Sequence, residues 1–149
     1  MSPANRLLSS PGLAPRDGAA RNNPRVLIVD DNLLNIELAA FVLTAAEFEV
    51  ESTTDADEMN ELVALFKPEL ILMDIQMPGT DGLELTRRLK ADPATQHIVV
   101  VAFTAYAMKG DEKKMRTAGC DGYIGKPIDV ATFADKLRSC IAAPAGEVN

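Results

Sequence analysis

The sequence of 149 residues is poor in several residue types that mark particular classes of protein. It contains no tryptophan, one histidine and two cysteines, and Cys120 and Cys140 lack the spacing of a metal-binding or disulfide framework. Its longest apolar runs, residues 38–43 and 98–103, are six residues long, whereas a membrane-spanning helix needs roughly 18 to 20. The N-terminus also lacks the apolar stretch of a secretory signal. We therefore expect a protein of the reducing cytoplasm with no membrane segment.

Positive charge is scarce and unevenly placed. The chain has 15 Lys and Arg residues against 22 Asp and Glu residues, and residues 1–25 hold four arginines and one aspartate. This segment carries a net charge of +3, which leaves −10 for residues 26–149. Because such an acidic body repels the phosphates of nucleic acids, we expect no nucleic-acid partner.

Length and composition indicate one globular domain between two tails. Residues 1–24 contain four prolines and no apolar periodicity, which predicts a flexible N-terminal tail. The domain is expected over residues 25–143, followed by a short C-terminal tail at 144–149.

From residue 25 onward, short apolar runs alternate five times with longer amphipathic segments. Strands are expected at 26–29, 48–53, 70–73, 98–103 and 122–124. Helices are expected over 32–46, from a cap at Asp55 to Pro68, over 82–90, over 111–118, and from a cap at Asp129. This alternation predicts an α/β fold with a doubly wound, parallel five-stranded sheet and helices on both faces. Because residues 48–51 alternate apolar and charged side chains, the second strand should lie at an edge.

The first and last helices differ in their apolar faces. In the last helix, Val130, Phe133 and Leu137 should share one buried face. In the first helix, the apolar side chains spread over roughly 200°, about twice the width of a normal core stripe. Two interpretations remain open for this surface: it contacts a partner, or it consists of helix-forming Ala and Leu residues tolerated in solvent.

Polar side chains stand where four of the apolar strands end. They are Asp30, Asp31, Asp74, Thr104 and Lys126. Because the carboxyl ends of parallel strands meet at one sheet edge, these groups should converge there. Three close carboxylates repel one another unless a cation lies among them. Oxygen-only ligands with no His or Cys nearby, and with room left for water and phosphate oxygens, favour magnesium over zinc or calcium. The sequence therefore predicts a Mg²⁺ site.

The same groups predict phosphoryl chemistry. The Lys126 ammonium suits a phosphate, and the Thr104 hydroxyl supplies a donor. Asp74 stands alone on the central strand, whereas Asp30 and Asp31 form a pair suited to holding the metal. Asp74 is therefore the expected nucleophile toward phosphorus, forming an acyl phosphate.

From about Arg25 to Ala142 the chain resembles the CheY-like receiver domain of bacterial two-component response regulators, and most of all DivK-type single-domain regulators and hybrid-kinase receivers. The steps from Asp74 to Thr104 and from Thr104 to Lys126, 30 and 22 residues, fit this family. The matching motifs are Asp30-Asp31, residues 72–79 around Asp74, Thr104-Ala105 and Lys126-Pro127. The resemblance implies the strand order 2-1-3-4-5 and a cis Lys126–Pro127 peptide.

The resemblance also implies a mechanism and partners. Asp74 would accept phosphate from a histidine kinase or a histidine phosphotransferase with Mg²⁺. The chain would then be a phosphoacceptor that phosphorylates and dephosphorylates itself, rather than a turnover enzyme. Gln76 joins the expected metal-site residues, and Thr104 and Tyr123 would form a switch pair. A downstream protein target would then bind the face made by the fourth helix, fifth strand and fifth helix. The expected phosphodonor-docking residues are Leu34, Asn35, Leu38, Pro127 and Ile128.

Other functions fit the sequence less well. A receiver segment of a hybrid histidine kinase remains open. A haloacid-dehalogenase-type phosphatase would need a second aspartate two positions after its nucleophile, where this chain has Gln76 after Asp74 and Asn32 after Asp30. An FMN-binding protein would need a Ser/Thr/Gly-rich loop after the first strand. His97, the one histidine, should lie at the opposite sheet edge from Asp74.

Overall fold

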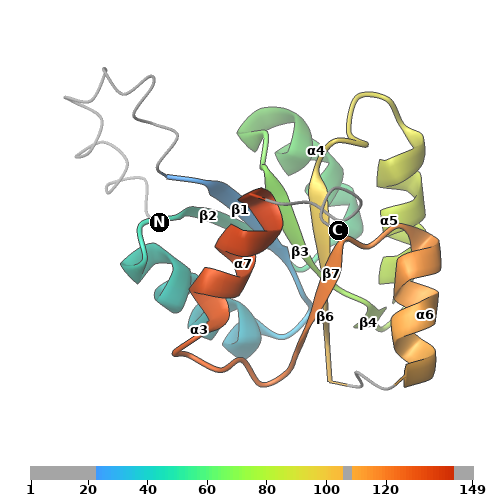
Figure 1. Cartoon of the computed structure of the whole chain (residues 1–149). Helices are drawn as coiled ribbons and strands as arrows, with labels where there is room; N and C mark the ends of the chain where they lie inside the picture. Colours follow the sequence, from blue (N-terminus) through green and yellow to red (C-terminus); the bar gives the residue numbers. More distant parts are fainter. Residues whose placement is uncertain (1–22, 106–108, 143–149) are drawn as a thin grey trace.

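The computed structural model describes residues 23–105 and 109–142, and Figure 1 shows its arrangement. The predicted tails at 1–24 and 144–149 lie outside the described residues, apart from residues 23 and 24. The central element is a five-stranded parallel sheet in the order β2-β1-β3-β6-β7, which confirms the predicted order. Its strands are β1 (Arg25–Val29), β2 (Glu49–Thr53), β3 (Leu70–Asp74), β6 (Val99–Thr104) and β7 (Gly122–Gly125).

In the described part of the chain, five helices cover the sheet in two layers, as expected for a doubly wound fold (Figure 1). The helices are α3 (Leu33–Ala45), α4 (Ala56–Phe66), α5 (Gly82–Ala91), α6 (Lys109–Ala118) and α7 (Phe133–Ala142). Along β1, Val26 and Ile28 join the core under α3 and α7, whereas Leu27 and Val29 join the core under α4, α5 and α6. This alternation of buried side chains requires a strand with both faces covered, which explains its continuous apolar sequence. None of the helices within the described residues is long and apolar enough to cross a membrane.

Side-chain caps set where several helices begin. The Asn32 carboxamide accepts hydrogen bonds from the first turn of α3, and the Asp55 carboxylate caps α4 as predicted. The α4 helix ends at Phe66, and the next residue, Lys67, adopts a left-handed conformation just before Pro68.

The start of the last helix was wrongly predicted. The Asp129 carboxylate accepts a hydrogen bond from the Ala131 amide, and the chain makes a turn before α7 begins at Phe133. Val130 lies in this turn and is 58% exposed rather than buried. Phe133 and Leu137 are fully buried, as expected.

One local element was not predicted. After β3 the chain forms a small antiparallel ladder of β4 (Gln76–Met77) and β5 (Thr80–Asp81). Gly79, with φ of 70°, allows the tight turn between the two strands. The ladder folds the chain back so that α5 begins next to the end of β3.

Candidate functional site

The five polar residues predicted to converge do meet at the carboxyl edge of the sheet. Asp74 and Thr104 end β3 and β6, Asp30 and Asp31 follow β1, and Lys126 follows β7. The side chains of Asp30, Asp74 and Thr104 are buried, whereas Asp31 is exposed. His97 is exposed and precedes β6, so it lies at the opposite edge as expected.

Three carboxylates form the acidic part of the site. One oxygen from each of Asp30, Asp31 and Asp74 can be chosen so that all three lie within 4.8 Å of one another. The Asp30 carboxylate is held by the Asn32 backbone amide at 2.8 Å and by the Asn35 carboxamide at 3.5 Å. An oxygen-only donor set that combines two buried carboxylates with an exposed one fits Mg²⁺, which keeps some of its water ligands.

Lys126 lies between the two buried carboxylates. Its Nζ is 3.0 Å from Asp30 Oδ2 and 3.4 Å from Asp74 Oδ2. The ammonium also stands 4.9 Å from the centre of the Phe103 ring, a distance suited to a cation–π contact. The Lys126–Pro127 peptide is cis, as expected.

The environment of Asp74 favours its neutral form. Burial raises the pKa of the Asp74 carboxyl from 3.8 to about 6; the Gln76 amide and Lys126 lower it, while Asp30 and Asp31 add to the rise. Its Oδ1 accepts the hydrogen bond from the Gln76 amide at 2.9 Å. The site therefore places a carboxyl with an unfavourable negative charge where a cation would stabilise that charge.

Gln76 meets the site through its main chain. Its amide holds Asp74, while its side chain is exposed at the start of β4. Its place in the metal site stays a prediction.

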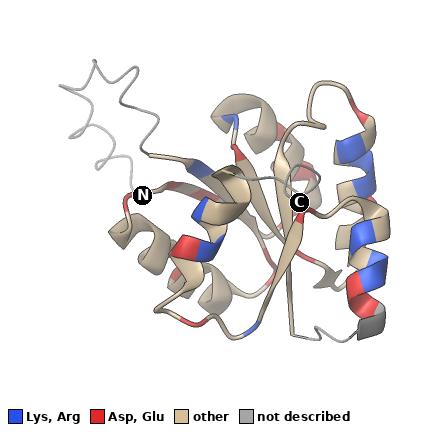
Figure 2. Ribbon diagram, viewed as in Figure 1, with Lys and Arg blue, Asp and Glu red and all other residues tan. Residues whose placement is uncertain are grey.

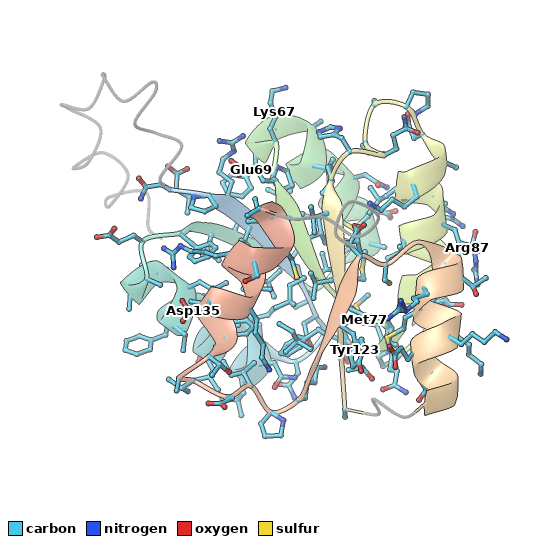
Figure 3. The ribbon with its side chains drawn as sticks, in the orientation of Figure 1. Lys67, Glu69, Met77, Arg87, Tyr123 and Asp135 are labelled. Carbon is cyan, nitrogen blue, oxygen red and sulfur yellow. The ribbon has the colours of Figure 1, made fainter. Side chains whose placement is uncertain are left out.

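The expected switch residues occupy neighbouring strands. Thr104, at the end of β6, is fully buried. Tyr123 is 41% exposed on the α6 side of β7 (Figure 3), and its hydroxyl lies 3.5 Å from Glu112 Oε1. The role of the pair stays a prediction.

The expected docking residues lie on α3, which begins just after Asp31, and in the loop that follows Lys126. Their role stays a prediction. Leu34 and Leu38 on α3 are 74% and 42% exposed. Pro127 is exposed, and Asn35 and Ile128 are half-buried. Phe41, one turn further along α3, is 73% exposed and extends the apolar stripe.

Sequence reasoning missed two supports of the site. Of the Asn32 and Asn35 contacts to Asp30, the Asn32 contact could have been inferred, because an aspartate side chain commonly accepts a hydrogen bond from the backbone amide two residues further on. The Phe103 ring beneath Lys126 had no such signal, because a buried phenylalanine in a strand indicates core packing alone.

Comparison with known proteins identifies the family. The family model of the response regulator receiver domain matches residues 26–138. The chain belongs to this family. Over 114 residues it is 46% identical to the polar-differentiation response regulator DivK of Brucella anthropi, covering 76% of this chain and 93% of DivK.

Solved structures agree with the receiver fold. A CheY-like receiver domain protein from Methanospirillum hungatei JF-1 has a TM-score of 0.72 at 26% identity, covering 80% of this chain and 94% of that protein. The receiver domain of the sensor histidine kinase PA1611 from Pseudomonas aeruginosa PAO1 has a TM-score of 0.72 at 26% identity, covering 81% and 99%. That structure has a magnesium ion in its active-site cleft. Membership of the receiver family places this protein in two-component signalling and disfavours the phosphatase and FMN-binding alternatives.

Proposed function

We propose that this receiver protein accepts a phosphoryl group from a phosphohistidine onto Asp74 with Mg²⁺ and signals through protein contacts in the cytoplasm. The observation that carries the proposal is the meeting of Asp74 with two further carboxylates, an ammonium and a hydroxyl-bearing residue at one sheet edge. The 46% identity to DivK supports a DivK-like role for the receiver domain.

The chain's own groups would divide the chemistry between them. An Asp74 oxygen would form the new O–P bond while the P–N bond of the donor breaks and its electron pair stays on the imidazole. The Lys126 ammonium, 3.4 Å from Asp74, would attract the transferred phosphoryl oxygens, and Thr104 would donate its hydroxyl to one of them. The product would remain an acyl phosphate at the sheet edge.

Asp30, Asp31 and Asp74, with Gln76 beside them, would hold the metal. Bound Mg²⁺ would supply positive charge that offsets the repulsion between these carboxylates and the incoming phosphate. The magnesium ion in the PA1611 receiver domain supports this assignment.

The signal would leave the site through the neighbouring strand. Phosphorylation adds about −1.5 to −2 of charge, which would draw Thr104 toward the phosphate. The space thus opened would admit the Tyr123 ring from its exposed position, changing the face made by α6, β7 and α7. A downstream protein target would read that face.

The phosphodonor would dock beside the site. Leu34, Asn35 and Leu38 on α3, with Pro127 and Ile128, form the proposed contact patch. Residues 26–66, which contain α3, hold ten Asp and Glu residues and no Lys or Arg. Most Lys and Arg residues lie on α5, α6 and α7 instead (Figure 2). The patch therefore suits a histidine kinase or phosphotransferase that presents apolar side chains surrounded by basic ones.

Labelling with acetyl phosphate tests the proposal. Intact-protein mass spectrometry should detect one added phosphoryl group in the presence of Mg²⁺, and chelation of the metal should prevent it. Asp74→Asn should abolish labelling. Asp92→Asn, which changes an exposed aspartate at the opposite edge, should leave it intact. Labelling of Asp74→Asn at the parental rate would disprove the assignment.

A further inference from the structure

The first turn of α5 packs directly against the backbone that carries Asp74. After β3 the chain runs out along β4 and back along β5, with Gln76 paired to Asp81 in the ladder. The next residue, Gly82, begins α5 beside the end of β3.

Gly82 leaves no room for a side chain. A Cβ atom there would lie 2.6 Å from Ile75 Cα and in still closer conflict with the Asp74 carbonyl oxygen. Both neighbours are backbone atoms, so no flexible side chain can move aside. The backbone at Gly82 does not have the positive φ seen at Gly79, so space rather than conformational freedom requires glycine here.

The helix cannot readily retreat from this contact. Within the helix, Asp81 Oδ1 accepts a hydrogen bond from the Leu83 amide and the buried Thr86 hydroxyl donates to the Gly82 carbonyl at 2.9 Å, so the first turn is stiff and moves only as a unit. Leu85, in the next turn, is buried in the core against the sheet. A group added at position 82 would therefore displace the Asp74–Gln76 backbone rather than the helix.

We propose that Gly82 is a positioning residue of the phosphoacceptor site, whose close packing holds the Asp74–Gln76 backbone in the geometry that metal and phosphoryl binding need. This inference rests on the proposed function of Asp74. It assigns to the first turn of α5 control over two site residues: Asp74 itself and Gln76, whose amide holds the Asp74 carboxylate.

Gly82→Ala tests the inference with two readouts. Titration with Mg²⁺ alone, followed by calorimetry, should show at least about tenfold weaker binding, and the rate of acetyl phosphate labelling should fall at least as far. Gly122→Ala is the matched control, because its Cβ would meet only the Cys140 sulfur at 3.4 Å, an ordinary contact. It should keep the parental Mg²⁺ affinity and rate. Unfolding in urea reports whether each variant is folded.

A second pair of variants adds no bulk at the site. Thr86→Val removes the hydroxyl that holds the Gly82 carbonyl, and Thr86→Ser keeps it. Mg²⁺ binding should weaken several-fold in Thr86→Val and stay parental in Thr86→Ser. If Gly82→Ala does not fold, the Mg²⁺ affinities of Thr86→Val and Thr86→Ser test whether the first turn of α5 positions the Asp74–Gln76 backbone.

Failure of this inference and failure of the proposed function would give different results. If the parent protein is labelled at Asp74 but folded Gly82→Ala binds Mg²⁺ and is labelled like the parent, Gly82 is not a positioning residue. Equal affinities in Thr86→Val and the parent would likewise overturn the inference. A parent protein that is not labelled at Asp74 would instead disprove the proposed function.

Discussion

Replacing Asp74 by asparagine should make the metal-free protein more stable at neutral pH. A carboxyl group whose pKa rises from 3.8 to about 6 on folding binds its proton more tightly in the folded state. Well below pH 3.8 the group is protonated in both states and costs nothing. Above about pH 6 it is ionised in both states, and the folded protein carries the full penalty of up to about 3 kcal/mol. Asparagine is neutral throughout, so Asp74→Asn should recover most of that penalty.

Urea unfolding followed by circular dichroism, in buffer with a chelator, measures this effect. At about pH 7.5 the free energy of unfolding of Asp74→Asn should exceed that of the parent by about 2 to 3 kcal/mol, and the difference should shrink toward zero near about pH 4. Asp31→Asn is the matched control. Its carboxylate is exposed and contributes the smallest of the causes that raise the Asp74 pKa, so its gain should be smaller.

The same urea unfolding measurement in the presence of Mg²⁺ is a second test. The ion should stabilise the parent, by about 2.7 kcal/mol at a concentration 100 times its Kd, and should stabilise Asp74→Asn less because one carboxylate ligand is gone. Equal stabilities of the parent and Asp74→Asn at pH 7.5 without metal, or a difference that does not change with pH, would refute the reasoning about burial and charge at this site.

Two further predictions concern the surfaces around the site. Leu34→Asp should slow phosphotransfer from a cognate phosphohistidine protein by about tenfold or more while leaving acetyl phosphate labelling unchanged, because one buried Leu contributes roughly 1 to 3 kcal/mol. Leu65→Asp changes a comparably exposed leucine on α4 and should affect neither reaction; a joint fall of both reactions in Leu34→Asp would mean damage to the fold or the metal site instead. The chain has two tyrosines, Tyr106 and Tyr123, and no tryptophan, so Tyr106→Phe leaves Tyr123 as the single tyrosine whose fluorescence is measured. In this variant, phosphorylation should reduce the quenching of Tyr123 fluorescence by acrylamide. Adding Thr104→Ala should remove this response. Unchanged quenching in the phosphorylated protein would contradict the proposed inward movement of the Tyr123 ring.

The strand pattern was predictable because each strand has a simple environment. β3 and β6 are buried along their whole length, and their sequences are continuously apolar. β2 is one of the two edge strands, and its alternating charged residues predicted that position. Helix ends were less predictable, since Asp129 can cap either a helix or a turn, and only tertiary packing around Phe133 decides between them.

The site was predictable to the extent that strand ends define it. Parallel strands bring Asp30, Asp74 and Thr104 to one edge whatever the details of the helices. The side-chain contacts that set the environment of the charged groups in the site follow no periodic pattern in the sequence. The Phe103 ring near the Lys126 ammonium depends on side-chain packing between strands, which no local pattern records.

The structure helps to decide between the two interpretations of the apolar surface of α3, which are a partner-binding surface and helix-forming residues tolerated in solvent. Ile36, Ala39 and Leu43 are buried against the sheet, so the core uses only one side of the helix. Leu34 and Phe41, on the other side, are 74% and 73% exposed. Helix propensity explains alanine in solvent, but an exposed phenylalanine gains nothing from it and loses the free energy of burial. A contiguous stripe of large apolar side chains on the helix that begins beside Asp30 and Asp31 therefore favours a partner-binding surface, and the proposed phosphodonor is the partner that would bury it.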